Sequence, residues 1–112
     1  IVPGQNTSLL ATEIYQLLET SDVPAGYINI LTTKQNSLNK ILSEHENIDG
    51  IWFFSENNNE RLKVIQSTTS NLKRTWCPQS KNLDWSSKEE YFLEEFLYQS
   101  TQVKNIWIPY GE

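Results

Sequence analysis

The chain has 112 residues, 38% of them hydrophobic, and a mean hydropathy of −0.54, which fits one small globular domain better than a disordered chain. Its net charge of −5 disfavours nucleic acids and anionic membrane surfaces as partners, because their phosphates would be repelled. No apolar run approaches the ~20 residues that a membrane-spanning helix needs.

The first half of the chain is predicted to hold two amphipathic helices around a short strand. Residues 7–20 have an apolar helical face, and V-P-A-G at 23–26 ends that helix. Residues 27–31 follow as a buried strand, and residues 34–45 form the second helix. The residues expected on the buried faces of the two helices are Leu10, Ile14, Leu17 and Leu18, then Leu38, Ile41 and Leu42.

The middle of the chain is predicted to form a strand, a helix and a second strand. The apolar run at 51–54 is typical of a parallel strand that is covered on both faces. Residues 57–70 follow as a helix, and residues 75–77 form a strand that Pro78 ends. The residues expected on the sheet-facing side of this helix are Leu62, Ile65 and Thr69.

The last third begins with a polar seam at residues 79–87. S-S-K-E at 86–89 has the spacing of a capping box and predicts a helix that runs to about Tyr98. Residues 103–108 are predicted to form a final strand, closed by Pro109. The residues expected in the apolar stripe of the helix are Phe92, Leu93, Phe96 and Leu97.

This alternation of strands and helices predicts an α/β fold with three layers, Rossmann-like, in which helices flank a mostly parallel sheet. We expect a single domain over residues 1–112, with residues 83–112 supplying a C-terminal helix and strand. Cys77 is the only cysteine, which excludes an internal disulfide and favours a reducing, cytoplasmic compartment. The absence of methionine leads us to expect a trimmed or excised part of a longer chain.

Residues 70–82 read S-N-L-K-R-T-W-C-P-Q-S-K-N. This stretch resembles the S-N-L-K-R-V-T-x-E-L-G-G-K segment of aldehyde dehydrogenases, in which the glutamate is the general base. Pro78 stands in the position of that glutamate, and proline has no ionisable group that could activate water. The resemblance therefore implies an enzyme-derived fold without its base.

Two further segments resemble the cofactor domain of the same family. V-P-A-G-Y-I-N-I-L-T at 23–32 is similar to L-P-x-G-V-V-N-V-V-T, and S-E-H-E-N-I-D-G-I at 43–51 is similar to S-H-P-x-V-D-K-I. The tail at 106–112 resembles the C-terminus of family 16 aldehyde dehydrogenases, in which an incomplete second unit follows the first. The resemblance implies that residues 1–82 are cofactor-domain-like. It also implies that the subdomain with the cysteine nucleophile is deleted between residues 82 and 88.

The family's cofactor contacts are also altered. Compared with the K-P-x-E, V-V-T-G and F-T-G-S segments, the changes are Val2 for lysine, Gln5 for glutamate, Thr33 for glycine, Glu56 for serine and Glu60 for the helix glycine, with Pro3 retained. A carboxylate at a helix N-terminus would repel a diphosphate by roughly 4 kcal/mol per charge pair at ~4 Å and an effective dielectric near 20. We predict no bound cofactor, no metal ion and no catalytic residue.

Other reactive residues have structural explanations. We expect Cys77 to be buried in a strand and His45 to cap a helix C-terminus rather than to catalyse. The glutamates Glu89, Glu90, Glu94 and Glu95 are expected on a solvated helix face rather than around a metal ion. Among the tryptophans, Trp52, Trp76 and Trp107 are expected in the core and Trp85 on the surface.

Two functions remain open: a non-catalytic module for oligomerisation or protein interaction, and a degenerate oxidoreductase domain that still binds a nicotinamide cofactor or an aldehyde. The family resemblance implies that the helix at 57–70 packs against its own copy. Val64 points about 200° away from Leu62 at ~100° per residue, so it would face solvent in a monomer beside the small residues Ser67 and Thr68. We predict a two-fold homodimer through these three residues, or packing against the rest of a larger dehydrogenase chain.

Overall fold

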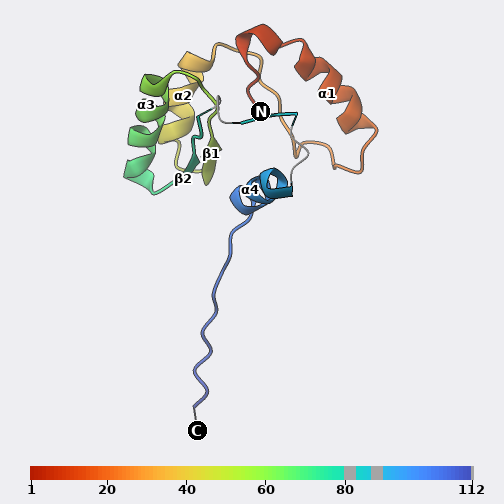
Figure 1. Ribbon diagram of the computed structural model, residues 1–112. Helices are drawn as coiled ribbons and strands as arrows, with labels where there is room; N and C mark the ends of the chain where they lie inside the picture. The colour runs from red at the N-terminus through yellow and green to blue at the C-terminus, as the bar shows by residue number, and fades with distance from the viewer. Residues whose placement is uncertain (80–82, 87–89, 112) are drawn as a thin grey trace.

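The computed structural model describes residues 1–79, 83–86 and 90–111, which form an α/β arrangement of helices around a small parallel sheet (Figure 1). The elements in chain order are α1 (Leu10–Glu19), α2 (Gln35–Glu44), β1 (Gly50–Trp52), α3 (Asn58–Thr68), β2 (Arg74–Trp76) and α4 (Glu90–Ser100), with 3₁₀ turns at Gln5–Thr7 and Thr69–Asn71. Within the described residues, no helix is long and apolar enough to cross a membrane.

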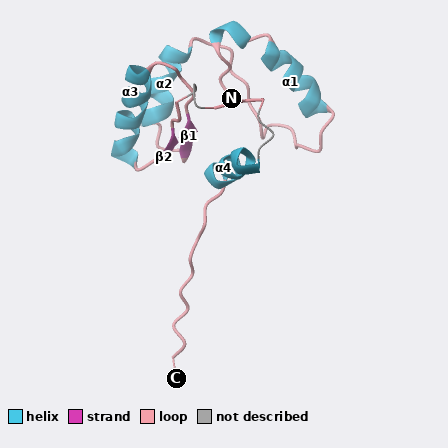
Figure 2. Cartoon of the chain, viewed as in Figure 1, coloured by secondary structure: helices cyan, strands magenta, loops and turns pink. Residues whose placement is uncertain are grey.

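β1, α3 and β2 form a parallel β-α-β unit, as the sequence predicts (Figure 2). Gly50 lies opposite Arg74 and Trp52 lies opposite Trp76. Beyond the strands, an isolated parallel bridge joins Ser55 to Gln79 and extends the pairing toward the carboxyl edge. β2 ends at Trp76, and Pro78 is the second residue after it, close to the predicted end of the strand.

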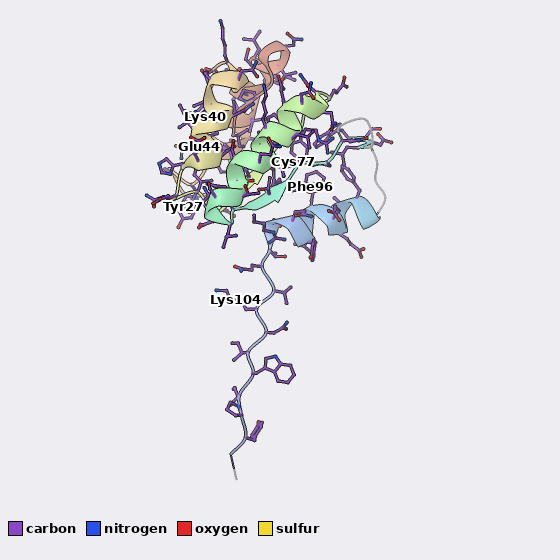
Figure 3. All side chains as sticks on the ribbon, turned by 90° about the vertical axis from the view of Figure 1, so that its left-hand side faces the viewer. Tyr27, Lys40, Glu44, Cys77, Phe96 and Lys104 are labelled. Atoms are coloured by element: carbon purple, nitrogen blue, oxygen red, sulfur yellow. The ribbon has the colours of Figure 1, made fainter. Side chains whose placement is uncertain are left out.

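Helices cover both faces of this sheet. On one face, the Thr75 hydroxyl of β2 donates to the Thr68 hydroxyl of α3 at 2.9 Å. Because side chains alternate along a strand, Trp76 points to the opposite face, where its ring centroid lies 4.9 Å from that of Phe96 in α4. Figure 3 shows Phe96 directed from α4 toward the sheet. Further edge-to-face contacts with these rings come from Trp52, Phe54 and Trp85, and Phe92 packs on Phe96 with its ring tilted.

Side chains of the S-N-L-K-R motif at 70–74 connect α2 and α4 to the sheet by hydrogen bonds. The Lys73 ammonium donates to the carbonyls of Leu42 and His45 at 3.3 and 2.5 Å, at the C-terminal end of α2. The Asn71 amide donates to the Ser43 carbonyl at 3.1 Å. These bonds satisfy carbonyls that a helix end leaves without a partner.

Arg74 does the same for α4. Its guanidinium donates to the Tyr98 carbonyl at 2.7 Å and to the Thr101 carbonyl, and it lies 5.6 Å from the centroid of the Tyr98 ring. Leu72, between the capping residues, has a φ of 52°. This left-handed residue turns the chain so that its neighbours can reach separate helices.

Two predicted strands are wrong. Residues 27–31 contain no strand, although the Leu31 N–H donates to the Ile1 carbonyl at 2.9 Å and the Ile1 ammonium donates to the Asn29 carbonyl at 2.6 Å. Residues 103–108 leave α4 as an extended tail that pairs with no strand among the described residues, and Trp107 is 92% exposed rather than buried in the core. In both cases, the pattern shows that a segment can pair, but a strand also needs a neighbour to supply hydrogen bonds.

The predicted orientation of α3 is also wrong. Val64 is 4% exposed and Thr68 is 3% exposed, whereas Leu62 is 47% exposed and Ile65 and Thr69 also face solvent. Ser67 is half-buried. Val64, Ser67 and Thr68 therefore do not form the exposed surface on which we located a dimer interface, although dimerisation itself stays a prediction.

Two other helices bury less than their sequences indicate. In α1, Ala11 is buried while Leu10, Ile14 and Leu17 are exposed. In α4, Phe92 and Phe96 point inward as predicted, but Leu93 and Leu97 are exposed. Figure 1 shows α1 standing apart from α2 and α3, which explains its uncovered face.

Candidate functional site

The carboxyl edge of the sheet is where ligands bind in open parallel folds, beside the N-terminus of the following helix. Here the turn after β1 leads into α3, and side chains of the turn accept hydrogen bonds from the free N–H groups around the start of the helix. The Ser55 hydroxyl accepts from the Asn57 N–H at 3.1 Å and donates to the Glu60 carboxylate at 3.2 Å. The Asn57 side chain accepts from the Asn59 N–H at 3.0 Å and so caps the helix.

These residues do not fit the diphosphate of a nicotinamide dinucleotide. Glu60 lies in the first turn of α3, is half-buried, and already supplies the negative charge that the helix dipole favours. Glu56 is exposed, so solvent weakens its repulsion to about 1 kcal/mol at ~4 Å in water. Glu60 therefore opposes a bound anion more strongly than Glu56 does. From the sequence, we had expected Glu56 to be the main source of repulsion.

The end of β2 carries Cys77 and Pro78, both half-buried. The Arg61 guanidinium of α3 donates to the Cys77 carbonyl through two nitrogens, at 3.1 and 2.6 Å. Burial raises the pKa of the Cys77 thiol, although the positive charge of Arg61 and the Phe53 backbone act in the opposite direction. The thiol therefore keeps its proton at neutral pH, which makes it a poor nucleophile.

A groove of about 510 Å³ lies between α2 and α3, next to the first turn of α3. Its lining is mainly polar and consists of Asn36, Asn39, Lys40, Ser43, Glu60, Lys63, Val64, Gln66 and Ser67. Figure 3 labels Lys40 on α2. No sequence pattern predicts this groove, because its lining residues are spread over two helices, and periodicity describes each helix separately.

The structure brings some of the altered cofactor positions together. Pro3 and Thr33 share a smaller pocket of about 280 Å³ with Lys34, whereas Val2 lies in a different cavity beside β1.

His45 is the C-cap residue of α2 as predicted, and its Nδ1 accepts from the Asn47 N–H at 3.2 Å. The part of the chain described contains no group of three or more acidic, histidine or cysteine side chains that could hold a metal ion.

Some predictions on the last helix are tested only in part. Glu94 and Glu95 are exposed as predicted, whereas Glu89 and the deletion proposed between residues 82 and 88 involve positions outside the described residues. Trp85 is exposed, although its ring contacts Phe54 at a centroid distance of 5.2 Å.

A parallel β-α-β unit whose crossover helix begins at the carboxyl edge of the sheet is the building unit of α/β folds. Residues 1–78 match the Aldehyde dehydrogenase family, and the chain therefore belongs to this family. The NADP/NAD-dependent aldehyde dehydrogenase PuuC of Escherichia coli (strain K12) is 27% identical over 74 residues, which are 66% of this chain. The chain spans 15% of the length of that relative. No solved structure matches the chain significantly.

Proposed function

We propose that this part of the protein is a non-catalytic aldehyde-dehydrogenase-like module that acts in oligomerisation or protein interaction. The observation that supports the proposal is the end of β2, where Arg61 donates to the Cys77 carbonyl and where the next residue, Pro78, stands in the position of the base according to the family resemblance. Acyl transfer by this family needs an activated nucleophile and a base within reach. A protonated, half-buried thiol beside a proline supplies neither.

The larger context is also part of the proposal. The tail at 106–112 supports descent from the incomplete unit of a family 16 aldehyde dehydrogenase. The β-α-β unit would then belong to a three-layer, Rossmann-like domain that pairs with a second copy or with the remainder of a larger dehydrogenase chain. The single unpaired cysteine is consistent with a cytoplasmic location.

The test is a direct assay of the purified chain with an aldehyde and a nicotinamide cofactor, together with calorimetric titration of the cofactor. We expect no turnover and a dissociation constant weaker than about 10 μM, or roughly −7 kcal/mol. Measurable turnover would overturn the proposal. If weak binding occurs, Glu60→Gly should strengthen it more than Glu56→Ser, because Glu60 lies inside the first turn of α3 and is less exposed. Equal affinities in both variants and the parent would mean that repulsion does not limit binding.

A second function is favoured by the groove between α2 and α3, which is large enough for part of a small ligand. A degenerate oxidoreductase domain that still binds a nicotinamide cofactor or an aldehyde would use this groove, with Lys40 and Lys63 facing an anionic group. Tryptophan fluorescence during titration with a nicotinamide dinucleotide tests this alternative. Saturable binding that Lys63→Met weakens would support it, and an unchanged affinity in Lys63→Met would exclude this groove as the site.

A further inference from the structure

Two cavities adjoin at the inner side of α2. The polar groove of about 510 Å³ between α2 and α3 and the cavity of about 280 Å³ beside β1 have three lining residues in common. These are Asn39 and Ser43 of α2 and Val64 of α3. Because Ser43 and Val64 are only 1% and 4% exposed, the two cavities meet below the surface of the domain.

The cavity beside β1 is mainly apolar, and we call it the apolar slot. Its apolar walls include Val2, Leu42, Ile48, Ile51, Phe53 and Val64. The Ser43 hydroxyl donates to the Asn39 carbonyl at 2.6 Å, and the Ser43 carbonyl accepts from the Asn71 amide at 3.1 Å. These groups of Ser43 therefore already have partners within the protein. A cavity that offers few polar partners holds water poorly and suits an apolar group.

The adjoining groove carries two lysines next to the place where the cavities meet. Lys40 follows Asn39 in α2, Lys63 precedes Val64 in α3, and both lysines are exposed. Adjacent helix residues lie about 100° apart, so each lysine reaches the rim of the groove while its neighbour lines the junction.

The charge of the groove suits a ligand with one negative charge. Besides the two lysines, Glu60 lines the groove, and its carboxylate accepts from the Ser55 hydroxyl at 3.2 Å. Two positive charges and one negative charge leave the lining with one positive charge in excess. A ligand with several negative charges would be repelled by Glu60, whereas a single carboxylate can lie near the lysines.

We propose that the groove and the apolar slot together bind a small amphiphile with a single carboxylate and a short, unbranched aliphatic chain. The carboxylate would lie between Lys40 and Lys63, and the chain would pass Asn39 and enter the apolar slot. This inference goes beyond the proposed interaction module. It rests on the groove of the second candidate function, to which it assigns an aliphatic carboxylate in place of a nicotinamide cofactor.

The test is calorimetric titration of the full chain with hexanoate, octanoate and octan-1-ol. Octanoate should bind roughly fifteenfold more tightly than hexanoate, because two further buried methylenes contribute about 1.6 kcal/mol at about 0.8 kcal/mol each. Octan-1-ol has the same chain as octanoate without the charge, and it should bind at least roughly tenfold more weakly.

Two variants test the positions of the carboxylate and the chain. Lys63→Met should weaken octanoate binding at least about fivefold, and the matched control Lys104→Met, in the exposed tail, should bind like the parent. Asn39→Trp places an indole where the cavities meet, so hexanoate and octanoate should then bind with similar affinity. Trp107→Ala should bind like the parent, which excludes adsorption on the apolar tail.

Circular dichroism establishes that each variant is folded, and the chain-length series in the parent decides the matter if Asn39→Trp does not fold. Equal affinities of the parent for hexanoate and octanoate, or for octanoate and octan-1-ol, would overturn the proposal. So would parent-like binding by Lys63→Met, or a chain-length dependence that persists in folded Asn39→Trp. Aldehyde turnover and dinucleotide titration are separate measurements, so carboxylate binding can fail while the non-catalytic function stands, and the reverse.

Discussion

Lys73→Met tests whether the retained S-N-L-K-R motif acts by capping helices. Lys73 is 9% exposed, and its ammonium donates to the Leu42 and His45 carbonyls at the end of α2. Methionine keeps most of the unbranched stem but removes both hydrogen bonds and the positive charge near the negative end of the helix dipole.

The expected loss follows from the two bonds and the charge. A hydrogen bond from a charged donor contributes about 1.5–3 kcal/mol, and a cation at a helix C-terminus about 0.3–1 kcal/mol. Removing the ammonium also removes the cost of its desolvation, which offsets part of this sum. We therefore expect a net loss of about 2–3 kcal/mol, which lowers the melting temperature of a domain of this size by roughly 8–12 °C.

The assay is thermal unfolding followed by far-ultraviolet circular dichroism, with Lys40→Met as the matched control. Lys40 is exposed on α2, the helix that Lys73 caps. The same chemical change there should alter the stability by no more than about 0.5 kcal/mol. If the two variants melt within about 2 °C of each other, water satisfies the carbonyls of α2 and Lys73 is not an important cap.

Three further predictions test the orientation of α3, the Cys77 thiol and the aromatic cluster. Val64→Asp should destabilise the domain by about 3 kcal/mol in denaturant unfolding because it buries a charge, whereas Leu62→Asp should cost no more than about 0.5 kcal/mol; equal losses would contradict the observed face of α3. Because burial raises the pKa of the Cys77 thiol, the folded state holds this proton more tightly than the unfolded state, and stability should fall as the pH rises above the thiol's ordinary pKa. Cys77→Ala should lessen this alkaline loss, and an unchanged pH profile would refute the assignment. Phe96→Ala should cost about 2–4 kcal/mol and weaken the near-ultraviolet signal of the tryptophans, while the exposed Leu97→Ala should leave both nearly unchanged.

The sequence was sufficient to predict the β-α-β unit. β1 lies in a short apolar run, α3 has clear limits, and Pro78 lies shortly after the end of β2. These are local signals, in which each residue contributes according to its own backbone preference. The C-cap position of His45 follows from the same kind of local reasoning.

The orientation of α3 was not predictable from apolar spacing. Its buried face holds Val64 together with polar side chains that are satisfied across the sheet. Arg61 reaches the Cys77 carbonyl and Thr68 reaches the Thr75 hydroxyl. A polar residue with a tertiary partner can occupy a buried position as stably as an apolar one, and single-sequence periodicity contains no information about such partners.

The same limit applies to the expected strands. Residues 27–31 and 103–108 have the composition of strands, but pairing depends on a neighbour of matching length and position. Within the part of the chain that the structure describes, the tail has no such neighbour, and its apolar side chains remain exposed.

The family motif separates into two parts according to what each residue does here. Asn71, Lys73 and Arg74 are retained, and each of them donates to carbonyls near the end of a helix. Pro78 departs from the family pattern and lies two residues beyond the end of β2. A chain that kept the fold without the chemistry would retain the capping residues, because their removal exposes unsatisfied carbonyls, and would tolerate change at the base. The family signature in residues 70–78 therefore supports the shared fold, and by itself it is no reason to expect dehydrogenase activity.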